Sequence, residues 1–293
     1  MASQVSIDEL AFSEENGFEA SSIKELLQHL RAQRTDEFTQ LRIIGWMSNL
    51  EPEDVHNISG EHVNKRNILA DNGCLNEILS AMERFPNNRQ LQHAACICIR
   101  NIGRNPLLIN MNNAYETMEE LVVVAIDAHG MNCDFAQSAF GAIENICSVG
   151  RRRAKFVNID VGKRIINIMD TFPVNESVQT KGFAALRKLR IEADTLMRLD
   201  IGTLSLRAMR NFPRNMDLQS EGCYIIAKAT KSNFKHAYSL LNLGAKDAVM
   251  KALRAARRSS TVVDVNIMTY ARQILFKALE QEEERAFWSE SYS

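Results

Sequence analysis

Apolar residues recur along this chain with the spacing of amphipathic helices, and these helices come in pairs. In residues 75–82, apolar side chains fall at i, i+3, i+4 and i+7, which places them on one helix face. A second apolar stripe covers residues 91–102. Between the two stretches, Pro86 ends the first helix, and Asn88 is placed to cap the second through its side-chain oxygen. The pattern predicts two antiparallel helices joined by a short turn.

The same pair of helices repeats along the chain. Phe-Pro followed by Asn and then by Gln occurs at residues 85–92, 172–179 and 212–219, and a degenerate copy occupies residues 129–146. Related apolar segments precede the turns and begin at Gly73, Asp160, Asp200 and Gly244, with a period of 40 to 44 residues. Such a period is typical of helical repeat proteins, in which each unit packs on its neighbours. We therefore expect a solenoid.

The stretch LQHAACICIRNI at residues 91–102 resembles the third helix of armadillo repeats nearly position by position. HEAT repeats are the nearest structural alternative. The resemblance covers roughly residues 20–278 and implies an all-α, right-handed α-solenoid of about six armadillo-like (ARM/HEAT) repeats. We place the solenoid at residues 21–279, between an acidic, disordered N-terminus (1–20) and an acidic C-terminal tail (280–293). The expected units are 21–72, 73–114, 115–159, 160–199, 200–243 and 244–279.

In armadillo proteins the third helices line a concave groove, and an Asn near the end of each holds the backbone of an extended peptide. The amide suits this role because it both donates and accepts hydrogen bonds. The matching positions here, which we call the ladder positions, are Asn49, Asn101, Asn145, Lys188 and Lys228. The change from Asn to Lys indicates an acidic ligand. The nuclear-import adaptors of the family carry Trp one turn earlier, where this chain has Gly45, Ile97, Gly141, Ala184 and Tyr224, so a role as a nuclear-localisation-signal receptor is not expected.

The charge distribution supports an acidic ligand. The whole chain has a net charge of −1, but residues 1–150 carry −11, residues 151–277 carry +14 and residues 278–293 carry −4. Polarity of this kind steers and orients a partner. Basic residues on or beside the predicted third helices are Arg187, Lys188, Arg190, Lys228 and Lys231, whereas we expect 151–153 and 257–258 to lie in loops. The tail at 280–293 is interpreted as a frayed helix end, a cap folded back on the basic half, or a docking peptide.

Motifs of enzymes, metal sites and cofactor sites were sought without result. The sequence has no Gly-rich phosphate loop, no G-x-S-x-G and no H-E-x-x-H. Cys96 and Cys98 lie two positions apart on one helix and so point in different directions, which argues against a shared zinc ion. We interpret the six cysteines as buried, reduced thiols. No enzymatic activity, cofactor or metal is expected.

The sequence therefore predicts a non-catalytic protein–protein interaction scaffold or adaptor. It is expected to bind a protein partner, through an acidic or extended segment, along the concave groove formed by Asn49, Asn101, Asn145, Arg187, Lys188, Lys228 and Lys231. Two alternatives stay open, namely a structural subunit of a larger multiprotein assembly and a nucleic-acid-binding solenoid that uses the basic half. The near-neutral total charge and the lack of interleaved aromatic residues count against nucleic acid.

The sequence also bears on location. The first thirty residues are acidic and lack an apolar run, which argues against a signal or transit peptide. Apolar stretches are too short to insert in a membrane. We therefore expect an intracellular protein, cytoplasmic or nuclear.

Overall fold

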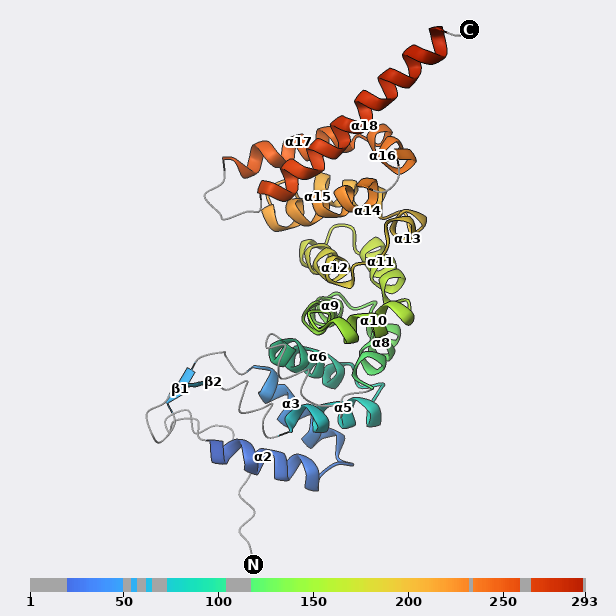
Figure 1. Cartoon of the computed structure of the whole chain (residues 1–293). Helices are drawn as coiled ribbons and strands as arrows, with labels where there is room; N and C mark the ends of the chain where they lie inside the picture. Colours follow the sequence, from blue (N-terminus) through green and yellow to red (C-terminus); the bar gives the residue numbers. More distant parts are fainter. Residues whose placement is uncertain are drawn as a thin grey trace, which may run out of the picture. The chain divides into compact units, whose positions relative to one another are not determined.

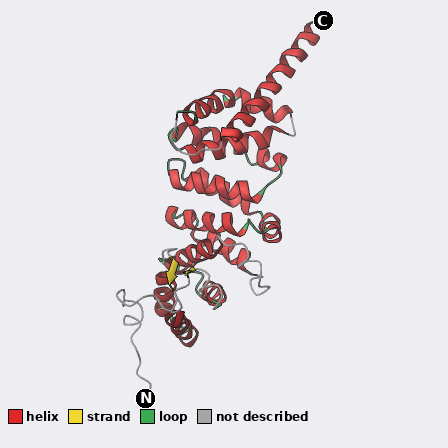
Figure 2. Cartoon of the chain, turned by 60° about the vertical axis from the view of Figure 1, so that its left-hand side comes forward, coloured by secondary structure: helices red, strands yellow, loops and turns green. Residues whose placement is uncertain are grey.

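The computed structural model describes the backbone of residues 20–49, 54–56, 62–64, 73–103, 117–231, 234–258 and 265–291, and nearly all of it is α-helical (Figure 2). The expectation of a helical fold is thus confirmed. One difference falls in the first predicted repeat, where strands β1 (Asp54–His56) and β2 (His62–Asn64) pair antiparallel, with Val55 opposite Val63. Each strand centres on a β-branched valine, a residue that favours extended backbone.

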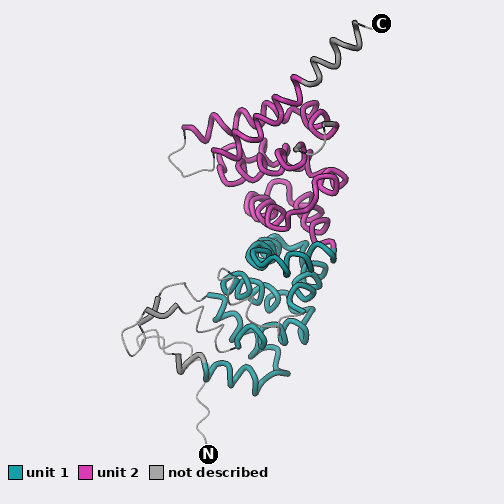
Figure 3. The backbone as a smooth tube through the Cα atoms, viewed as in Figure 1, with its two compact units in different colours: residues 1–159 teal, residues 160–293 magenta. Residues whose placement is uncertain are grey.

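The chain divides into two compact units, unit 1 (Met1–Ile159) and unit 2 (Asp160–Ser293) (Figure 3). The division coincides with the expected boundary between the third and fourth repeats. It also lies close to the point where the charge changes sign, so unit 1 is acidic and the helical part of unit 2 is basic.

Unit 1 is built from two rows of helices that alternate along the chain (Figure 1). The first row holds α2, α5 and α8, and the second holds α3, α6 and α9, with α6 packed between α3 and α9. A short helix, α10, follows and packs on α8. The bounds are α2 (Ala20–Ala32), α3 (Glu37–Ser48), α5 (Cys74–Arg84), α6 (Arg89–Gly103), α8 (Met118–His129), α9 (Cys133–Ile146) and α10 (Gly150–Asn158).

Unit 2 repeats this arrangement. Its first row holds α11, α14 and α17, and its second holds α12, α15 and α18, with α15 packed between the other two. Short helices α13 and α16 connect successive pairs. The bounds are α11 (Val161–Thr171), α12 (Glu176–Leu189), α13 (Ala193–Arg198), α14 (Ile201–Asn211), α15 (Met216–Lys231), α16 (Phe234–Asn242), α17 (Ala245–Ala256) and α18 (Val265–Ser291).

The predicted asparagine caps form at the start of the second-row helices. In each case the side-chain oxygen accepts from the backbone N–H three residues later, at 2.8 to 3.0 Å. This satisfies one of the N–H groups that a helix start leaves without a partner. The capping residues are Asn88, Asn132, Asn175 and Asn215.

A buried glutamine four residues after the cap closes the turn. Gln219 donates from Nε2 to Met209 O at 2.8 Å and to Phe212 O at 3.0 Å, the last carbonyls of the preceding helix. Gln92 and Gln179 make the equivalent pairs of bonds. One glutamine side chain thereby fastens the second helix of a repeat to the end of the first.

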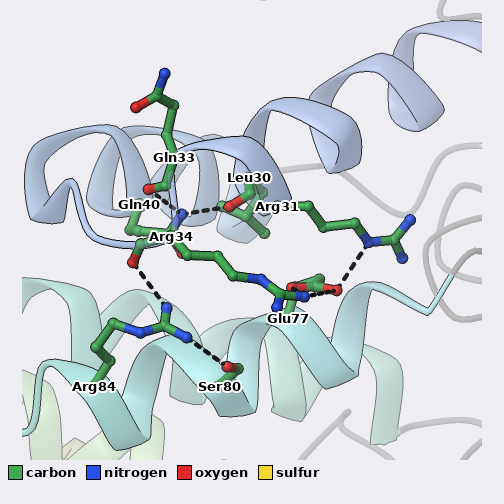
Figure 4. A network of polar contacts seen from close by, with 8 residues as sticks. All are labelled: Leu30, Arg31, Gln33, Arg34, Gln40, Glu77, Ser80 and Arg84. Carbon is green, nitrogen blue, oxygen red and sulfur yellow. Dashed lines mark hydrogen bonds and ion pairs between the residues drawn. The ribbon is translucent and has the colours of Figure 1, made fainter.

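The first repeat contains the same device, although it lacks Phe-Pro. Asp36 accepts from the N–H of Phe38 at 3.3 Å. Gln40 donates to Leu30 O at 2.7 Å and to Gln33 O at 3.0 Å (Figure 4). Asp36 and Gln40 have the same spacing as Asn88 and Gln92. The first repeat is therefore in register with the others, a match that an alignment based on Phe-Pro does not reveal.

Four first-row helices begin at a residue in the left-handed conformation. These residues are Gly73 (φ 77°), Asp160 (φ 54°), Asp200 (φ 53°) and Gly244 (φ 86°), the same four that open the repeated segments in the sequence. Glycine adopts this conformation without a steric penalty, and aspartate tolerates it better than most residues. The repeat is thus preserved in the backbone even where the amino acid differs.

Ion pairs of buried glutamates join neighbouring helices in unit 1. Glu77 of α5 is 8% exposed, and it pairs with Arg31 at 2.9 Å and Arg34 at 3.3 Å; Arg84 donates to Arg34 O at 2.8 Å (Figure 4). At the other end, Arg152 of α10 pairs with Glu119 of α8 at 3.0 Å. The arginines at 151–153 therefore lie in a helix, which corrects the expectation of a loop.

Several expectations concern residues whose placement the structure does not describe. The expected disorder at 1–20 concerns residues that the structure does not describe, except for Ala20, at which α2 begins. The side chain of Lys231 also lies outside the described residues. At the other end of the chain α18 continues to Ser291, past the expected repeat limit at 279. Among the described residues, no helix is both long enough and apolar enough to cross a membrane.

Candidate functional site

The ladder positions are equivalent in the structure as well as in the sequence. Each lies 13 residues after its capping residue, at or near the C-terminal end of a second-row helix. Unit 1 contains Asn49, Asn101 and Asn145, and unit 2 contains Lys188 and Lys228. The structure therefore places the expected residues in two short rows, one in each unit.

In unit 1 the ladder asparagines bind neighbouring helices. Asn145 Nδ2 donates to Arg100 O at 2.7 Å, and Asn101 Nδ2 donates to Ser48 O at 3.4 Å. Each accepting carbonyl belongs to the residue just before the ladder position of the preceding repeat. At least one amide donor of Asn101 and of Asn145 thus holds two repeats together, whereas Asn49 is exposed and forms the C-cap of α3.

A side chain of unit 1 also covers a position at which the import adaptors carry Trp. Gly141 lies one turn before Asn145, and a Cβ added at Gly141 would come within 2.6 Å of Arg100 Cδ. Arg100 therefore lies flat across α9 at this point, in space that the missing side chain leaves. The protein's own residues thus occupy this part of the row, whereas the space beside Gly45, one turn before Asn49, is open.

Unit 2 differs because Tyr224 occupies the position equivalent to Gly141 of unit 1. Arg187, the counterpart of Arg100, forms an ion pair with Glu221 at 2.8 Å, and its guanidinium carbon lies 6.0 Å from the centre of the Tyr224 ring. A cation at this distance is attracted to the ring face. Arg187 is therefore held on α15 by a carboxylate and an aromatic ring.

Beside Tyr224 opens a cavity of about 530 Å³, which we call the Lys228 cavity. Its walls come from the start of α13, from α15 and from the start of α18, and they include Tyr224, Lys228, Ile267 and Tyr270. Volumes of about 300 to 1,000 Å³ with apolar walls and a few polar groups are typical of ligand sites. Lys228 is half-buried at this cavity, and Lys188 occupies the equivalent position on α12, the next helix of the row.

The remaining cavity residues could not be found from the sequence. Ala193, Asn266 and Tyr270 belong to helices that are far from Lys228 along the chain, and only packing brings them together. A partial signal existed for Tyr224, because it holds the position at which the import adaptors carry Trp. It indicated an aromatic wall but not the cavity beside it.

His93 lies between α6 and α9 rather than in an open groove. Its Nε2 is 2.9 Å from Ser138 Oγ, and burial lowers the pKa of the imidazole below its usual value. A neutral imidazole is the form that suits a hydroxyl partner in a half-buried place. We therefore assign His93 to packing between these two helices.

The described side chains form no group of three His, Cys, Asp or Glu residues that could hold a metal ion. All six cysteines are free, and five are buried. Burial raises the pKa of the Cys74, Cys96 and Cys223 thiols to about 12. A thiol with so high a pKa is a poor nucleophile, because the thiolate is the reactive form.

Cys133 is expected to be the first cysteine that reacts with iodoacetamide in the folded protein. It is half-exposed, whereas the other five thiols are buried. Peptide mass spectrometry after a short incubation should find modification at Cys133 alone, and all six sites should react in urea. Early modification of Cys96 or Cys223 would contradict the packing described above.

The chain was compared with protein-family models, with curated proteins and with solved structures, and no match was found in any of the three.

Proposed function

We propose that this chain is an armadillo-type helical repeat protein that acts as a non-catalytic scaffold. Its binding site is the second-row face of unit 2, on α12, α15 and α18, and its ligand is an extended acidic segment of a protein partner. The repeated caps, the buried glutamines and the left-handed helix starts support the assignment to a helical repeat class. The sequence of the second-row helices supports the armadillo type.

The observation that carries the binding proposal is the Lys228 cavity. It lies at a ladder position, beside the aromatic residue that corresponds to the ligand-binding Trp of related adaptors. An extended peptide needs hydrogen-bonding or charged groups along its backbone and pockets for alternate side chains. Lys188 and Lys228 supply cations on adjacent helices, and the cavity supplies a pocket.

Unit 1 is proposed to contribute less to binding. The amides of Asn101 and Asn145 are engaged between helices, and Arg100 covers Gly141. The row in unit 1 therefore stabilises the stacking of its repeats, and binding by Asn49, Asn101 and Asn145 stays a prediction of the sequence. The basic character of unit 2 favours an acidic ligand there.

Charge reversal at both lysines is expected to abolish capture of the partner. A crosslinking pull-down from native lysate should compare the wild type with Lys188→Glu/Lys228→Glu. Loss of two ion pairs and the new repulsion should weaken binding by about tenfold or more. The proteins that are lost should share acidic segments, and a peptide from such a segment should bind the purified wild-type chain.

A control pair changes the same charge on the other row. Lys163 on α11 and Lys251 on α17 are exposed, and Lys163→Glu/Lys251→Glu alters the net charge equally. The control should keep the partners of the wild type. Equal loss in both variants would indicate a nonspecific effect of net charge, and an unchanged partner set in the Lys188/Lys228 variant would refute the proposed site. Salt-sensitive recovery of nucleic acid in place of protein would favour the nucleic-acid alternative.

A further inference from the structure

The walls of the Lys228 cavity indicate the chemistry of its ligand. Two tyrosines, Tyr224 and Tyr270, stand in its walls together with Ala227 and Ile267, so most of the lining is aromatic or aliphatic. Aromatic rings prefer edge-to-face or offset contact with other rings. Tyr270 is 44% exposed although it is large and aromatic, so a ligand can still cover much of it.

The polar groups of the cavity define the rest of the ligand. Lys228 on α15 and Asn266 at the start of α18 line the cavity, and each already interacts with another group of the chain. Glu192 stands at the edge near α13 and is exposed, so water screens its charge more than that of the half-buried Lys228. An aromatic group flanked by carboxylates therefore matches both the walls and the charge.

The chain itself contains a segment with this chemistry. Residues 280–293, EQEEERAFWSESYS, include five glutamates, one arginine and the adjacent aromatic pair Phe287 and Trp288. Residues 160–279 of the same unit carry 20 Lys and Arg against 10 Asp and Glu. A cavity of about 530 Å³ has room for a large aromatic side chain.

The segment cannot reach the cavity of its own chain while α18 is intact. Ile267, in the cavity wall, lies near the start of α18, and this helix continues to Ser291. The 20 residues from Ile267 to Phe287 correspond to about 30 Å of helix at 1.5 Å per residue. Only the cavity of another molecule lies within reach of the tail.

We infer that residues 280–293 of a second copy dock in the Lys228 cavity. One ring of the Phe287–Trp288 pair lies against Tyr224 and Tyr270, because successive residues of a helix point about 100° apart, and the glutamates lie near Lys228 and Lys188. This inference rests on the proposed function, because it uses the same face. The contact joins two different surfaces, so it can propagate from copy to copy. It also competes with an acidic partner, which must displace the tail.

Sedimentation velocity of the full chain over a range of concentrations tests the inference. The wild type should show a sedimentation coefficient that rises with concentration, and high salt should weaken the rise. The variant Phe287→Ala/Trp288→Ala should remain monomeric at concentrations at least tenfold higher. A wild type that sediments as a monomer at every concentration would overturn the inference, as would equal self-association of this variant.

A binding measurement locates the contact. The probe is a fluorescent synthetic peptide of residues 280–293, titrated with full chain that carries Phe287→Ala/Trp288→Ala, so that its own tail does not compete. Tyr270→Ala in that background should weaken binding at least tenfold. The control is Tyr238→Ala on α16, which removes a tyrosine of similar exposure (41%) away from the cavity. Binding within twofold of the parent for Tyr270→Ala would refute the site.

The proposed function and the inference about the tail can be refuted independently. If the peptide does not bind but the pull-down depends on Lys188 and Lys228, the face binds an external partner and the inference about the tail is wrong. If the peptide binds and Tyr270→Ala abolishes it while no lysate protein depends on the lysines, the cavity serves self-association alone. Circular dichroism of each variant must match that of the wild type for these readings to apply.

Discussion

Replacement of Arg152 by alanine is expected to lower the free energy of unfolding of unit 1 by about 3–5 kcal/mol. Arg152 and Glu119 form an ion pair in which both residues are buried, at 4% and 0% exposure, and one guanidinium nitrogen contacts both carboxylate oxygens at 3.0 and 3.3 Å. Removal of the arginine leaves a buried carboxylate without its cation, and water does not reach it. The measurement is urea unfolding followed by circular dichroism and by tryptophan fluorescence in a Trp288→Phe background, in which Trp46 of α3 reports on unit 1.

Two further variants separate the ion pair from general effects. Arg151→Ala removes the preceding, exposed arginine of the same helix and should change stability by no more than about 0.5 kcal/mol. Glu119→Leu/Arg152→Met replaces both charges with apolar groups and should recover most of the loss, since a desolvated pair stabilises little over an apolar one. A loss below about 1 kcal/mol for Arg152→Ala would show that Glu119 becomes protonated or hydrated at little cost.

The helical repeat could be predicted from the sequence because its determinants are local. A proline, a capping asparagine and a glutamine within eight residues specify a turn, and the structure contains the predicted cap at Asn88, Asn175 and Asn215. The same local logic extends to the degenerate copy, where Asn132 caps α9 without Phe-Pro. The first repeat follows it too, through Asp36 and Gln40.

Features that depend on contacts between distant segments could not be predicted. Three arginines in a row look like a solvated loop, but successive residues of a helix point about 100° apart, so only one of them faces a neighbouring helix. That Arg152 faces Glu119 follows from the packing of α10 on α8. The Lys228 cavity could not be predicted from the sequence for the same reason, because three helices form it.

The two rows of ladder positions show why equivalent positions need not share a role. In unit 1 a glycine at 141 leaves room for Arg100 to lie across α9, and the amide of Asn145 donates from α9 to a carbonyl of α6. In unit 2 a tyrosine at the equivalent position holds Arg187 over its ring and also lines the Lys228 cavity. The choice between glycine and tyrosine at one position thus separates a row that supports stacking from one that is open to a ligand.

Replacement of Gln219 by alanine is expected to destabilise unit 2 by about 2–4 kcal/mol, because two carbonyls lose their donor at once and each unsatisfied group costs about 1–3 kcal/mol. Gln219 is 3% exposed, and its bonds to Met209 O and Phe212 O are the contacts that fasten α15 to the end of α14. The variant should still fold, since the third repeat has Ala136 at the equivalent position and retains its helix pair.

Urea unfolding of the Gln219 variant should be compared with that of Gln273→Ala, which removes an exposed glutamine from α18 and should shift stability by no more than about 0.5 kcal/mol. Hydrogen exchange should also localise the effect, with faster exchange in α14 and α15 than in α11 and α12. Uniform acceleration across unit 2 would mean that the glutamine supports the unit as a whole. A loss below about 1 kcal/mol would mean that water replaces the amide donor, in which case the recurrence of this glutamine reflects the geometry of the turn more than its stability.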